Sequence, residues 1–413
     1  MQNCQYQFSA TMALHSFFSY CSLPFISFFF CFFFFFHGEG AFSPSPEEVG
    51  ICEAVVRPYG YKCQEFEVTT EDGYILGMQR IPVGRNGVIG GTRQPVLLQH
   101  GVLMDGMAWL LNSPEQSLAF VLADNGFDVW IGNIRGTRSS YRHVSLKPSD
   151  RAYWAWSWDE LVVNDLPAMI DLVSKQTKQK LHYVGHSLGT LIALASFSEG
   201  RVVDKLRSAA LLCPIAYLDH MKTKLGILAA KLFVGEILSN LLGLAEFNPK
   251  GLEASKWLNK LCSYPDVNCY DLLTAFTGNN CCLNGSTVQL FLEYEPQPTS
   301  TKNMVHLAQT FRDGVLTKYN YGANNIQIYG QSTPPIYNLS NIPNSLPLYL
   351  SYGGRDSLSD TEDVEHLLQD LKLHDTDKLV LHFVQNYAHV DFIMGVSAKQ
   401  VVYDSMMAFL RQQ

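Results

Sequence analysis

One serine stands in the most informative stretch of the chain, Gly185-His186-Ser187-Leu188-Gly189. The pattern Gly-x-Ser-x-Gly is typical of a serine on a sharp turn between a strand and a helix, when both elements are present. An apolar run, Leu181–Val184, precedes the serine, and small residues typical of a helix follow over Leu188–Glu199. This context predicts that Ser187 is a nucleophile on a strained turn, beside a helix N-terminus that favours developing negative charge.

A serine hydroxyl needs a base, which is usually a histidine oriented by a carboxylate. In folds that carry such a turn, the order along the chain is serine, acid, histidine. His389 lies in a loop just past the predicted strand Lys378–Val384, and Asp356 follows the predicted strand Leu346–Tyr352 after two glycines. We therefore predict that His389 is the base and that Asp356 is the orienting acid.

Other residues after the nucleophile have the right chemical type for these two roles. They are His220, His306, His366, His374 and His382 for the base, and Asp360, Asp363 and Asp391 for the acid. His382 lies inside a predicted strand, and Asp360 belongs to the first turn of a predicted helix, where carboxylates commonly cap. Asp391 is only two residues from His389, and so short a loop seldom brings a carboxylate onto the ring.

Attack on a carbonyl group also needs two N–H groups that stabilise the oxyanion. One should come from Leu188, the residue after the nucleophile. The other should come from Val102, in the loop that follows the predicted strand Pro95–Gln99. His100 and His186 stand beside these groups, but their positions are more typical of turns shaped by hydrogen bonds than of proton transfer.

Short apolar strands alternate with helices along most of the chain, which predicts an α/β fold with a mostly parallel sheet covered by helices. A hairpin is expected first, formed by Gln64–Thr70 and Tyr74–Ile81. Further strands are expected at Pro95–Gln99, Phe127–Gly132, Leu181–Val184, Ala209–Cys213, Leu346–Tyr352 and Lys378–Val384. Helices are expected at Glu115–Asp124, Trp158–Ser174, Leu188–Glu199, Asp360–Leu371 and Lys399–Leu410.

A long segment between two of these strands breaks the alternation. We expect residues 215–343 to form a largely helical cap over the sheet, inserted between the core segments 42–214 and 344–413. An independent second domain is the alternative, although its ends would have to return to neighbouring strands. The strongly apolar helix expected at Leu225–Phe247 would line the substrate site and move to admit substrate, or else pack as an ordinary core helix.

The first 41 residues differ in composition from the rest. The chain is almost entirely apolar from Phe17 to Phe36, and small residues follow near a plausible cleavage point. Residues 1–41 are interpreted as a secretory signal peptide, or as an uncleaved anchor, because about 20 apolar residues can span a bilayer. Asn284 and Asn338 begin glycosylation motifs. Together these features predict a secreted or vacuolar protein, membrane-anchored if the leader is retained.

Seven of the ten cysteines follow the leader. Cys52 and Cys63 flank a Pro-Tyr-Gly turn and could close a small loop. Four more lie within the predicted cap, Cys262, Cys269, Cys281 and Cys282. No pair has histidine partners at zinc-finger spacing, so disulfides are favoured over a metal, and we expect neither metal nor cofactor. Cys213 lies in an apolar run and is expected to be a buried free thiol.

Composition limits the classes of partner. The 413 residues carry a net charge of −8, and only 16% are charged. Since Lys and Arg form no cluster, neither nucleic acid nor an anionic membrane surface is expected as the main partner. The hydrophobic content of 47% excludes intrinsic disorder and suffices for one or two large cores. No obligate protein partner is evident.

In combination, these motifs resemble the acid lipase family of gastric and lysosomal lipases, most closely its plant triacylglycerol-lipase-like branch. The matching stretches are Val68–Leu76, Leu98–Gly101, Leu118–Trp130, Gly132–Gly136, Trp156–Glu160, the turn at Ser187, Gly353–Asp356 and Tyr387–Phe392. The resemblance implies an α/β-hydrolase fold with a lidded cap, and hydrolysis of acylglycerols or sterol esters. It also implies a triad of Ser187, Asp356 and His389.

The resemblance further implies oxyanion donors at Val102 and Leu188 and a cap disulfide, most plausibly Cys262–Cys269. The chain departs from the family pattern at two points. Leu188 stands where the gastric enzymes have glutamine, although a backbone donor is retained. The adjacent cysteines Cys281 and Cys282 leave the pairing within the cap open.

The function expected from these residues is a serine ester hydrolase that acts on a lipid ester at an interface or micelle. A non-catalytic α/β-hydrolase that only binds a lipid is an alternative from another class. A decayed site would be expected to lack at least one member of the triad, and none is missing. An acyltransferase or a short-chain esterase using the same site is the alternative among enzymes.

Overall fold

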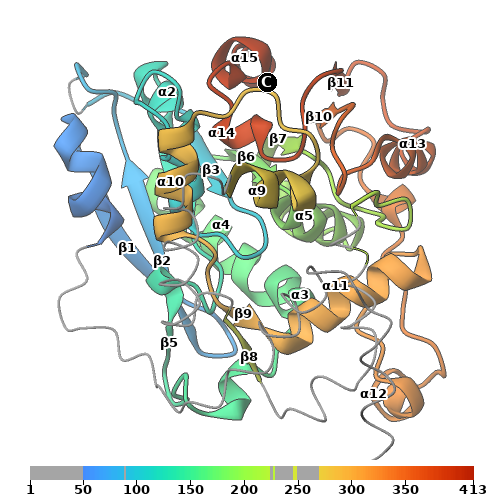
Figure 1. The fold of residues 1–413 in the computed structure, drawn as a ribbon. Coiled ribbons are helices and arrows are strands. Elements are labelled where there is room, and N and C mark those ends of the chain that lie inside the picture. The colour runs from blue at the N-terminus through green and yellow to red at the C-terminus, as the bar shows by residue number, and fades with distance from the viewer. Residues whose placement is uncertain (1–49, 88–89, 224–226, 228–244, 249–268) are drawn as a thin grey trace, which may run out of the picture. The chain divides into compact units, whose positions relative to one another are not determined.

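The computed structural model describes residues 50–87, 90–223, 227, 245–248 and 269–413, which all belong to one structural unit (Figure 1). The predicted leader, residues 1–41, lies outside the described residues. So do Cys262 of the expected Cys262–Cys269 bridge and most of the helix expected at Leu225–Phe247. Within the described part, no helix is long and apolar enough to cross a membrane.

A nine-stranded sheet is the central element of the described part, in the order β1-β2-β4-β3-β6-β7-β10-β11, with β5 paired to β2. Its strands are β1 (Gln64–Thr69), β2 (Tyr74–Ile81), β3 (Pro95–Gln99), β4 (Asp128–Gly132), β5 (Arg142–His143), β6 (Leu181–His186), β7 (Leu206–Leu212), β10 (Leu348–Gly353) and β11 (Leu379–Val384). Neighbours from β4 to β11 are parallel, whereas β2 is antiparallel to both β1 and β4.

Alternate side chains of the central strands enter two different cores. In β3, Val96 and Leu98 pack into one core, and Leu97 packs into the other. Because successive side chains point to opposite faces, a strand buried on both faces must be apolar throughout. The parallel strands therefore appear in the sequence as continuous apolar runs, which is why they could be predicted.

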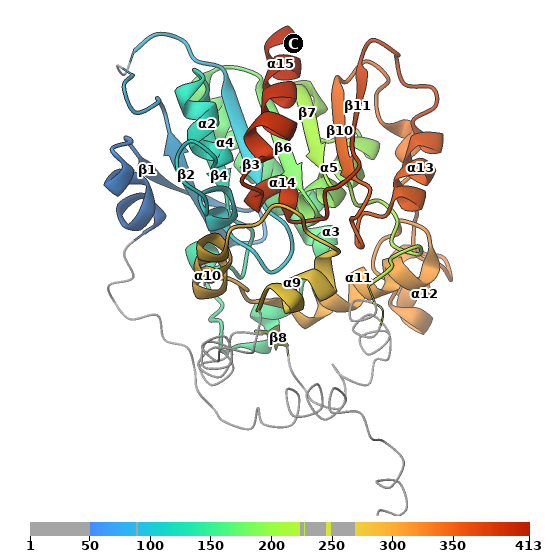
Figure 2. The ribbon, with the colours of Figure 1, turned by 45° about the horizontal axis from the view of Figure 1, so that its top comes forward.

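Helices cover both faces of this sheet. Residues of α2 (Leu118–Asp124) and α15 (Asp404–Gln412) belong to the first core, and Figure 2 shows α15 in front of the strands. Residues of α4 (Leu166–Thr177), α5 (Leu188–Ser198) and α13 (Thr361–Asp370) belong to the second core. Helices on both faces of a mostly parallel sheet confirm the predicted α/β architecture.

The predicted elements correspond closely to the observed ones, although two predicted helices contain a π-helical stretch. The helix predicted at Lys399–Leu410 begins with such a stretch over Lys399–Tyr403, before α15. The stretch predicted as one helix, Trp158–Ser174, consists of α3 (Trp158–Glu160), a π-helical turn over Leu161–Asp165, and α4. Pro167 lies in the first turn of α4 and explains the break. Its ring lacks an N–H and would collide with the carbonyl four residues earlier in a continuous α-helix.

The segment between β7 and β10 contains α9 (Cys269–Thr277), α10 (Gly285–Tyr294), α11 (Thr301–Asp313), α12 (Asn325–Tyr329) and a short antiparallel pair, β8 (Glu246–Phe247) with β9 (Thr299–Ser300). Its ends return to adjacent parallel strands, β7 and β10. The end of α9 also contacts the loop after β10, through a bridge between Gly278 and Asp356. These contacts agree with the expected cap, whose boundaries 215–343 stay a prediction.

Two disulfides are formed among the described cysteines. Cys52 is bonded to Cys63, which confirms the predicted loop closure. Cys281 is bonded to its neighbour Cys282, so this pair takes no other partner in the cap. Cys213 is a buried free cysteine, as predicted.

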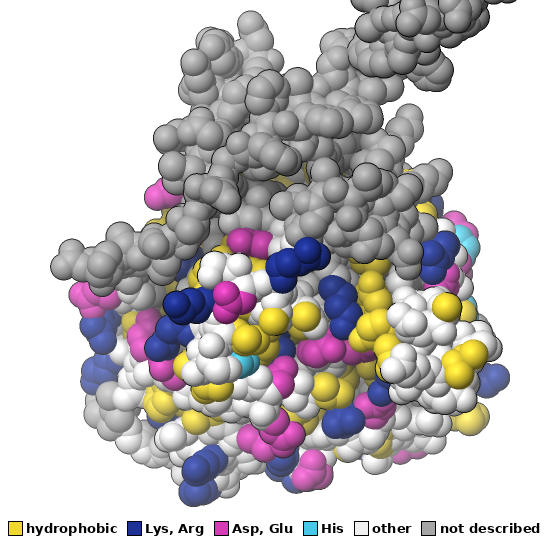
Figure 3. Space-filling model, turned by 90° about the horizontal axis from the view of Figure 1, so that it is seen from below, with side chains coloured by type: hydrophobic (Ala, Val, Ile, Leu, Met, Phe, Trp, Pro, Cys, Tyr) yellow, Lys and Arg dark blue, Asp and Glu magenta, His cyan; other side chains and the backbone are white. Residues whose placement is uncertain are grey.

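Charged side chains of both signs are mixed on the surface. Figure 3 shows Lys and Arg side chains interspersed with Asp and Glu on the described part of one face. Ion pairs between exposed side chains, such as Arg85–Glu115 and Lys205–Asp171, bring opposite charges together. On that face, the described side chains therefore present no extended field of a single sign.

Candidate active site

Ser187 occupies the strained turn between β6 and α5. Its backbone has φ 55° and ψ −120°, a conformation that a residue with a side chain rarely adopts. Such strain costs on the order of 1–3 kcal/mol and is commonly found at functional sites. A Cβ at Gly185 would lie 2.8 Å from the Gly189 carbonyl oxygen, and one at Gly189 would lie 2.4 Å from the Gln99 carbonyl oxygen. Both glycines are thus required by close backbone approach.

The loop after β3 passes directly against the serine. A Cβ built on Gly101 would lie 3.0 Å from the Ser187 Cβ and 3.4 Å from its Oγ, so only glycine leaves the nucleophile uncovered. Val102 follows Gly101 in this loop, and Leu188 follows Ser187. Among the described residues, no hydrogen bond occupies the N–H of Val102 or of Leu188. Both N–H groups are therefore without an acceptor among the described residues.

His389 and Asp356 form a buried hydrogen-bonded pair. The His389 Nδ1 lies 2.9 Å from the Asp356 Oδ2, and both residues are at most 4% exposed. The other oxygen of Asp356, Oδ1, accepts the N–H groups of Leu358 and Ser359 at 2.8 and 2.9 Å. These bonds fix the carboxylate at the end of β10. The neighbouring parallel strand is β11, and the loop after β11 carries His389.

The His389 imidazole lies next to the turn that carries Ser187. Its ring centroid is 4.8 Å from that of His186, whose Nε2 donates to the His389 carbonyl oxygen at 3.0 Å. The His389 Nε2 is buried and has no hydrogen-bond partner among the described residues. The hydrogen bond between Ser187 and His389 is therefore not formed in this structure, and Nε2 is left as an unoccupied acceptor. Such bonds often tighten only when substrate binds.

His100 and His186, the two histidines next to the expected oxyanion donors, have structural partners. His100 Nδ1 lies 2.8 Å from the Gly101 carbonyl oxygen, and its Nε2 accepts the Ile134 N–H at 3.2 Å. Burial lowers the pKa of His100 to about 4. Burial and the neighbouring His389 hold the pKa of His186 well below its usual value. Both rings are neutral and fixed by the backbone, as their positions in the sequence indicated.

The three other aspartates considered for the role of the acid bind groups other than the His389 ring. Asp360 caps α13 by accepting the Glu362 N–H at 3.0 Å, and it pairs with Lys222. Asp363 accepts from the His220 ring. Asp391 accepts three backbone N–H groups, those of Ala388, Cys281 and Cys282. Only Asp356 among these four reaches the His389 ring.

The contacts of Asp391 were not predicted from the sequence. Its carboxylate joins the loop that carries His389 to a segment about 110 residues earlier, at distances of 2.8–3.1 Å. In the same segment, the Thr277 carbonyl oxygen accepts a hydrogen bond from the His389 N–H at 3.2 Å. Thr277 to Cys282 therefore fixes the backbone of the histidine loop. Only the position of Asp391 two residues after a candidate base could have drawn attention to it.

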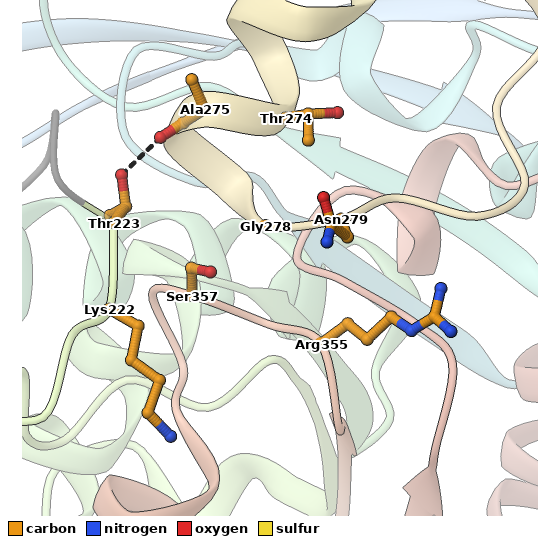
Figure 4. A pocket seen from close by; sticks show the side chains of 8 residues that line it. All are labelled: Lys222, Thr223, Thr274, Ala275, Gly278, Asn279, Arg355 and Ser357. Carbon is orange, nitrogen blue, oxygen red and sulfur yellow. Dashed lines mark hydrogen bonds between the residues drawn. The ribbon is translucent and has the colours of Figure 1, made fainter.

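A pocket of about 380 Å³ lies beside this site (Figure 4). Arg355, the residue before Asp356, extends along it, and Lys222 lines the opposite side. Lys222 is already paired with Asp360 and Glu362. Neither Ser187 nor His389 lines this pocket, so it is distinct from the place where the ester bond would lie.

Among the residues that the structure describes, three groups of side chains have the composition of metal ligands, but each has another explanation. Cys281 and Cys282 are bonded to each other beside Asp391. Asp219 and Asp363 are both ion-pair partners of the His220 ring. In the third group, His186, Cys213 and His389, burial raises the pKa of the Cys213 thiol, which donates to the His389 carbonyl oxygen.

The parallel sheet and the serine turn after β6 together define an α/β-hydrolase. The family model described as a partial alpha/beta-hydrolase lipase region matches residues 52–113, and the alpha/beta hydrolase fold model matches residues 94–261. Triacylglycerol lipase 2 of Arabidopsis thaliana is 58% identical over 369 residues, 88% of each chain. Human gastric triacylglycerol lipase is 36% identical, covering 89% of this chain and 92% of its own. The chain belongs to the acid lipase family, with the plant triacylglycerol lipases, and is a carboxylic ester hydrolase.

Solved structures show the same fold at low sequence identity. A putative lipase from Sulfolobus solfataricus has a TM-score of 0.57 at 15% identity and covers 85% of this chain and 94% of its own. A soluble variant of monoglyceride lipase from Saccharomyces cerevisiae has a TM-score of 0.53 at 17% identity, with coverage of 89% and 99%. At such identities the likeness concerns the fold alone.

Proposed function

We propose that the chain cleaves acylglycerols or related lipid esters through an acyl-enzyme on Ser187. His389 Nε2 accepts the hydroxyl proton while the Ser187 Oγ attacks the ester carbonyl, and it then returns the proton to the leaving alcohol. Water attacks the acyl-enzyme in the same way and releases the fatty acid. Asp356 holds the ring with Nδ1 protonated and stabilises the imidazolium that forms.

The observation that carries this proposal is the buried pair of His389 and Asp356 beside the strained serine. The 2.9 Å contact uses Nδ1 of the ring, so Nε2 is the atom left to accept a proton. The ring also lies 4.8 Å from that of His186, the residue before the nucleophile. The three residues follow three parallel strands, β6, β10 and β11, in the chain order that a serine hydrolase needs.

The tetrahedral intermediate would be stabilised by the N–H groups of Val102 and Leu188. Leu188 begins α5, so its N–H also lies at the positive end of a helix dipole. A backbone donor does not depend on the side chain, which is why leucine can replace glutamine at this position. Two such donors lower the barrier by several kcal/mol in enzymes of this kind, roughly 3–4 kcal/mol for each.

The substrate class follows from the relatives, which are named as triacylglycerol lipases, and we propose a lipid ester presented at an interface or micelle. The cap over residues 215–343 would cover the ester site. For the compartment we propose the secretory route, with secretion or delivery to the vacuole. The Cys52–Cys63 disulfide supports an oxidising compartment, and the motif residues Asn284 and Asn338 are both exposed.

Steady-state hydrolysis of esters of increasing acyl length tests this proposal. The wild type is expected to cleave long-chain acylglycerols, and Ser187→Ala should lose on the order of 10⁴-fold or more in kcat on every chain length. Ser149→Ala, at an exposed serine, is the matched control and should keep full activity. Hydrolysis of short esters alone would point to an esterase, and binding of lipid without any turnover would point to a non-catalytic protein.

A further inference from the structure

Glu295 is a fully buried carboxyl group next to the loop that carries Val102. It follows directly after α10, within the cap segment, and has no exposed surface. Its Oε1 accepts the N–H of Asp105 at 3.0 Å, across 190 residues of sequence. Asp105 lies three residues after Val102. One end of the expected oxyanion loop is therefore held by this carboxyl group.

Gln297, two residues after Glu295, holds the middle of the same loop. The Gln297 N–H donates to the Leu103 carbonyl oxygen at 2.8 Å. Leu103 has φ 59°, a left-handed conformation that favours glycine and that a leucine adopts only under constraint. The segment from Glu295 to Gln297 thus binds the Leu103 carbonyl oxygen and the Asp105 N–H, in the same loop that contains Val102.

Burial and the Asp105 carboxylate favour the neutral form of Glu295, whereas Arg138 and the Asp105 N–H favour the ionised form. The Asp105 carboxylate is paired with Arg138 at 2.8 Å. Asp105 acts on Glu295 from the loop after β3, and Arg138 acts on it from the turn before β5. The Glu295 Oε2 has no hydrogen-bond partner among the described residues. An ionised carboxylate with one unpartnered oxygen in such a place would be very costly. Burial, followed by the charge of Asp105, holds the pKa of Glu295 well above its usual value.

We propose that Glu295 is a positioning residue of the proposed esterase reaction: as a neutral carboxylic acid it fixes the oxyanion loop, and when it loses its proton at higher pH its charge repels the Asp105 carboxylate and releases that loop. The proposal rests on the function proposed above, because it assigns a purpose to the orientation of the Val102 N–H. It predicts that kcat declines at alkaline pH and that ionisation of Glu295 causes this decline.

The same ionisation makes a separate prediction for stability. In the unfolded chain Glu295 loses its proton near its usual pKa of 4.5, whereas the folded protein retains the proton to higher pH. Above that value the folded state binds more protons than the unfolded state, so stability falls as the pH rises toward the folded pKa. A neutral side chain at this position should remove that dependence.

Glu295→Gln and Glu295→Ala test the proposal, with Glu293→Gln as the matched control at an exposed glutamate on α10. The amide of Glu295→Gln can still accept the Asp105 N–H and cannot ionise. Its kcat for a soluble short-chain ester should lack the alkaline decline of the wild type. Its melting temperature should exceed that of the wild type by a margin that grows above about pH 4.5. Glu293→Gln should follow the wild type in both measurements.

Glu295→Ala removes the acceptor and should lose at least ~10-fold in kcat, with KM changed by less than ~3-fold, because an oxyanion donor acts mainly in the transition state. If this variant does not fold, the pH profile of Glu295→Gln decides alone. An alkaline decline in Glu295→Gln identical to that of the wild type would overturn the proposal. The proposed function would survive that result, since it depends on the loss of turnover in Ser187→Ala.

Discussion

Asp356 and Asp360 are four residues apart, yet they bond to different groups. Asp356 holds the His389 ring, whereas Asp360 caps α13 and pairs with Lys222. A carboxylate on the ring sets the tautomer and stabilises the imidazolium, and a cap only stabilises the helix. At the scale of single residues, the two aspartates therefore allow a matched comparison.

Asp356→Asn should lower kcat by up to ~10⁴-fold while the protein stays folded. Asp360→Asn should keep nearly full activity. Asparagine is also a good N-cap, so its stability should change by no more than ~1 kcal/mol, from loss of the ion pair with the exposed Lys222. Ester turnover and thermal melting are measured for both variants. Loss of activity in Asp360→Asn together with an active Asp356→Asn would place the acid one helical turn later.

At this scale the sequence could predict a contact that follows from chain order and position. The pairing of Asp356 with His389 could be predicted because each follows a predicted parallel strand, and such strands end at one edge of the sheet. Glu295 could not be assigned in this way. Its role depends on a contact with Asp105, 190 residues earlier, that no local pattern reveals.

At the scale of elements, the loop with His389 is held by Asp391, which begins the short helix α14 (Asp391–Met394). Asp391→Asn replaces one acceptor oxygen by an NH₂ group, so at least one of its three backbone donors loses its partner. We expect a loss of about 1–3 kcal/mol in the free energy of unfolding, measured by denaturant titration. The matched control is Asp313→Asn, at an exposed residue that ends α11, where a change within ~0.5 kcal/mol is expected.

A reduced kcat for Asp391→Asn at temperatures where it remains folded would further support the role of this loop in holding His389. Equal stabilities of Asp391→Asn and the wild type would show that the three N–H contacts are not needed. The measurement at several temperatures separates loss of the folded protein from loss of geometry within it.

The elements themselves were predictable to different degrees. Strands such as β3 and β6 could be located because burial on both faces demands continuous apolar runs. The two-residue strand β5 could not, since Arg142 and His143 carry no strand pattern and pair only through contact with β2. The π-helical turn before α4 was also missed, although Pro167 is the local cause.

At the scale of the whole molecule, the Cys52–Cys63 disulfide ties the start of the described chain together where both cysteines enter the first core. Its sequence separation is 11 residues. By the loop-entropy argument, the double variant Cys52→Ser/Cys63→Ser should lose about 2–3 kcal/mol in the free energy of unfolding. Urea titration measures the change.

The second disulfide provides the comparison for that experiment. Cys281 and Cys282 are adjacent, so their bond closes almost no chain, and the loop-entropy argument assigns it much less stabilisation. Their backbone N–H groups, which bind Asp391, are kept in Cys281→Ser/Cys282→Ser. If this variant loses more stability than the Cys52 and Cys63 variant, the argument from loop length does not hold for this protein.

The central claim is that Ser187 is the nucleophile of this lipase, and covalent labelling tests it most directly. The purified protein is treated with a fluorophosphonate, digested, and the modified peptide is identified by mass spectrometry. We expect one adduct, on Ser187, with ester turnover lost in proportion to labelling, and no adduct in Ser187→Ala. An adduct on another residue, or full ester turnover by Ser187→Ala, would contradict it.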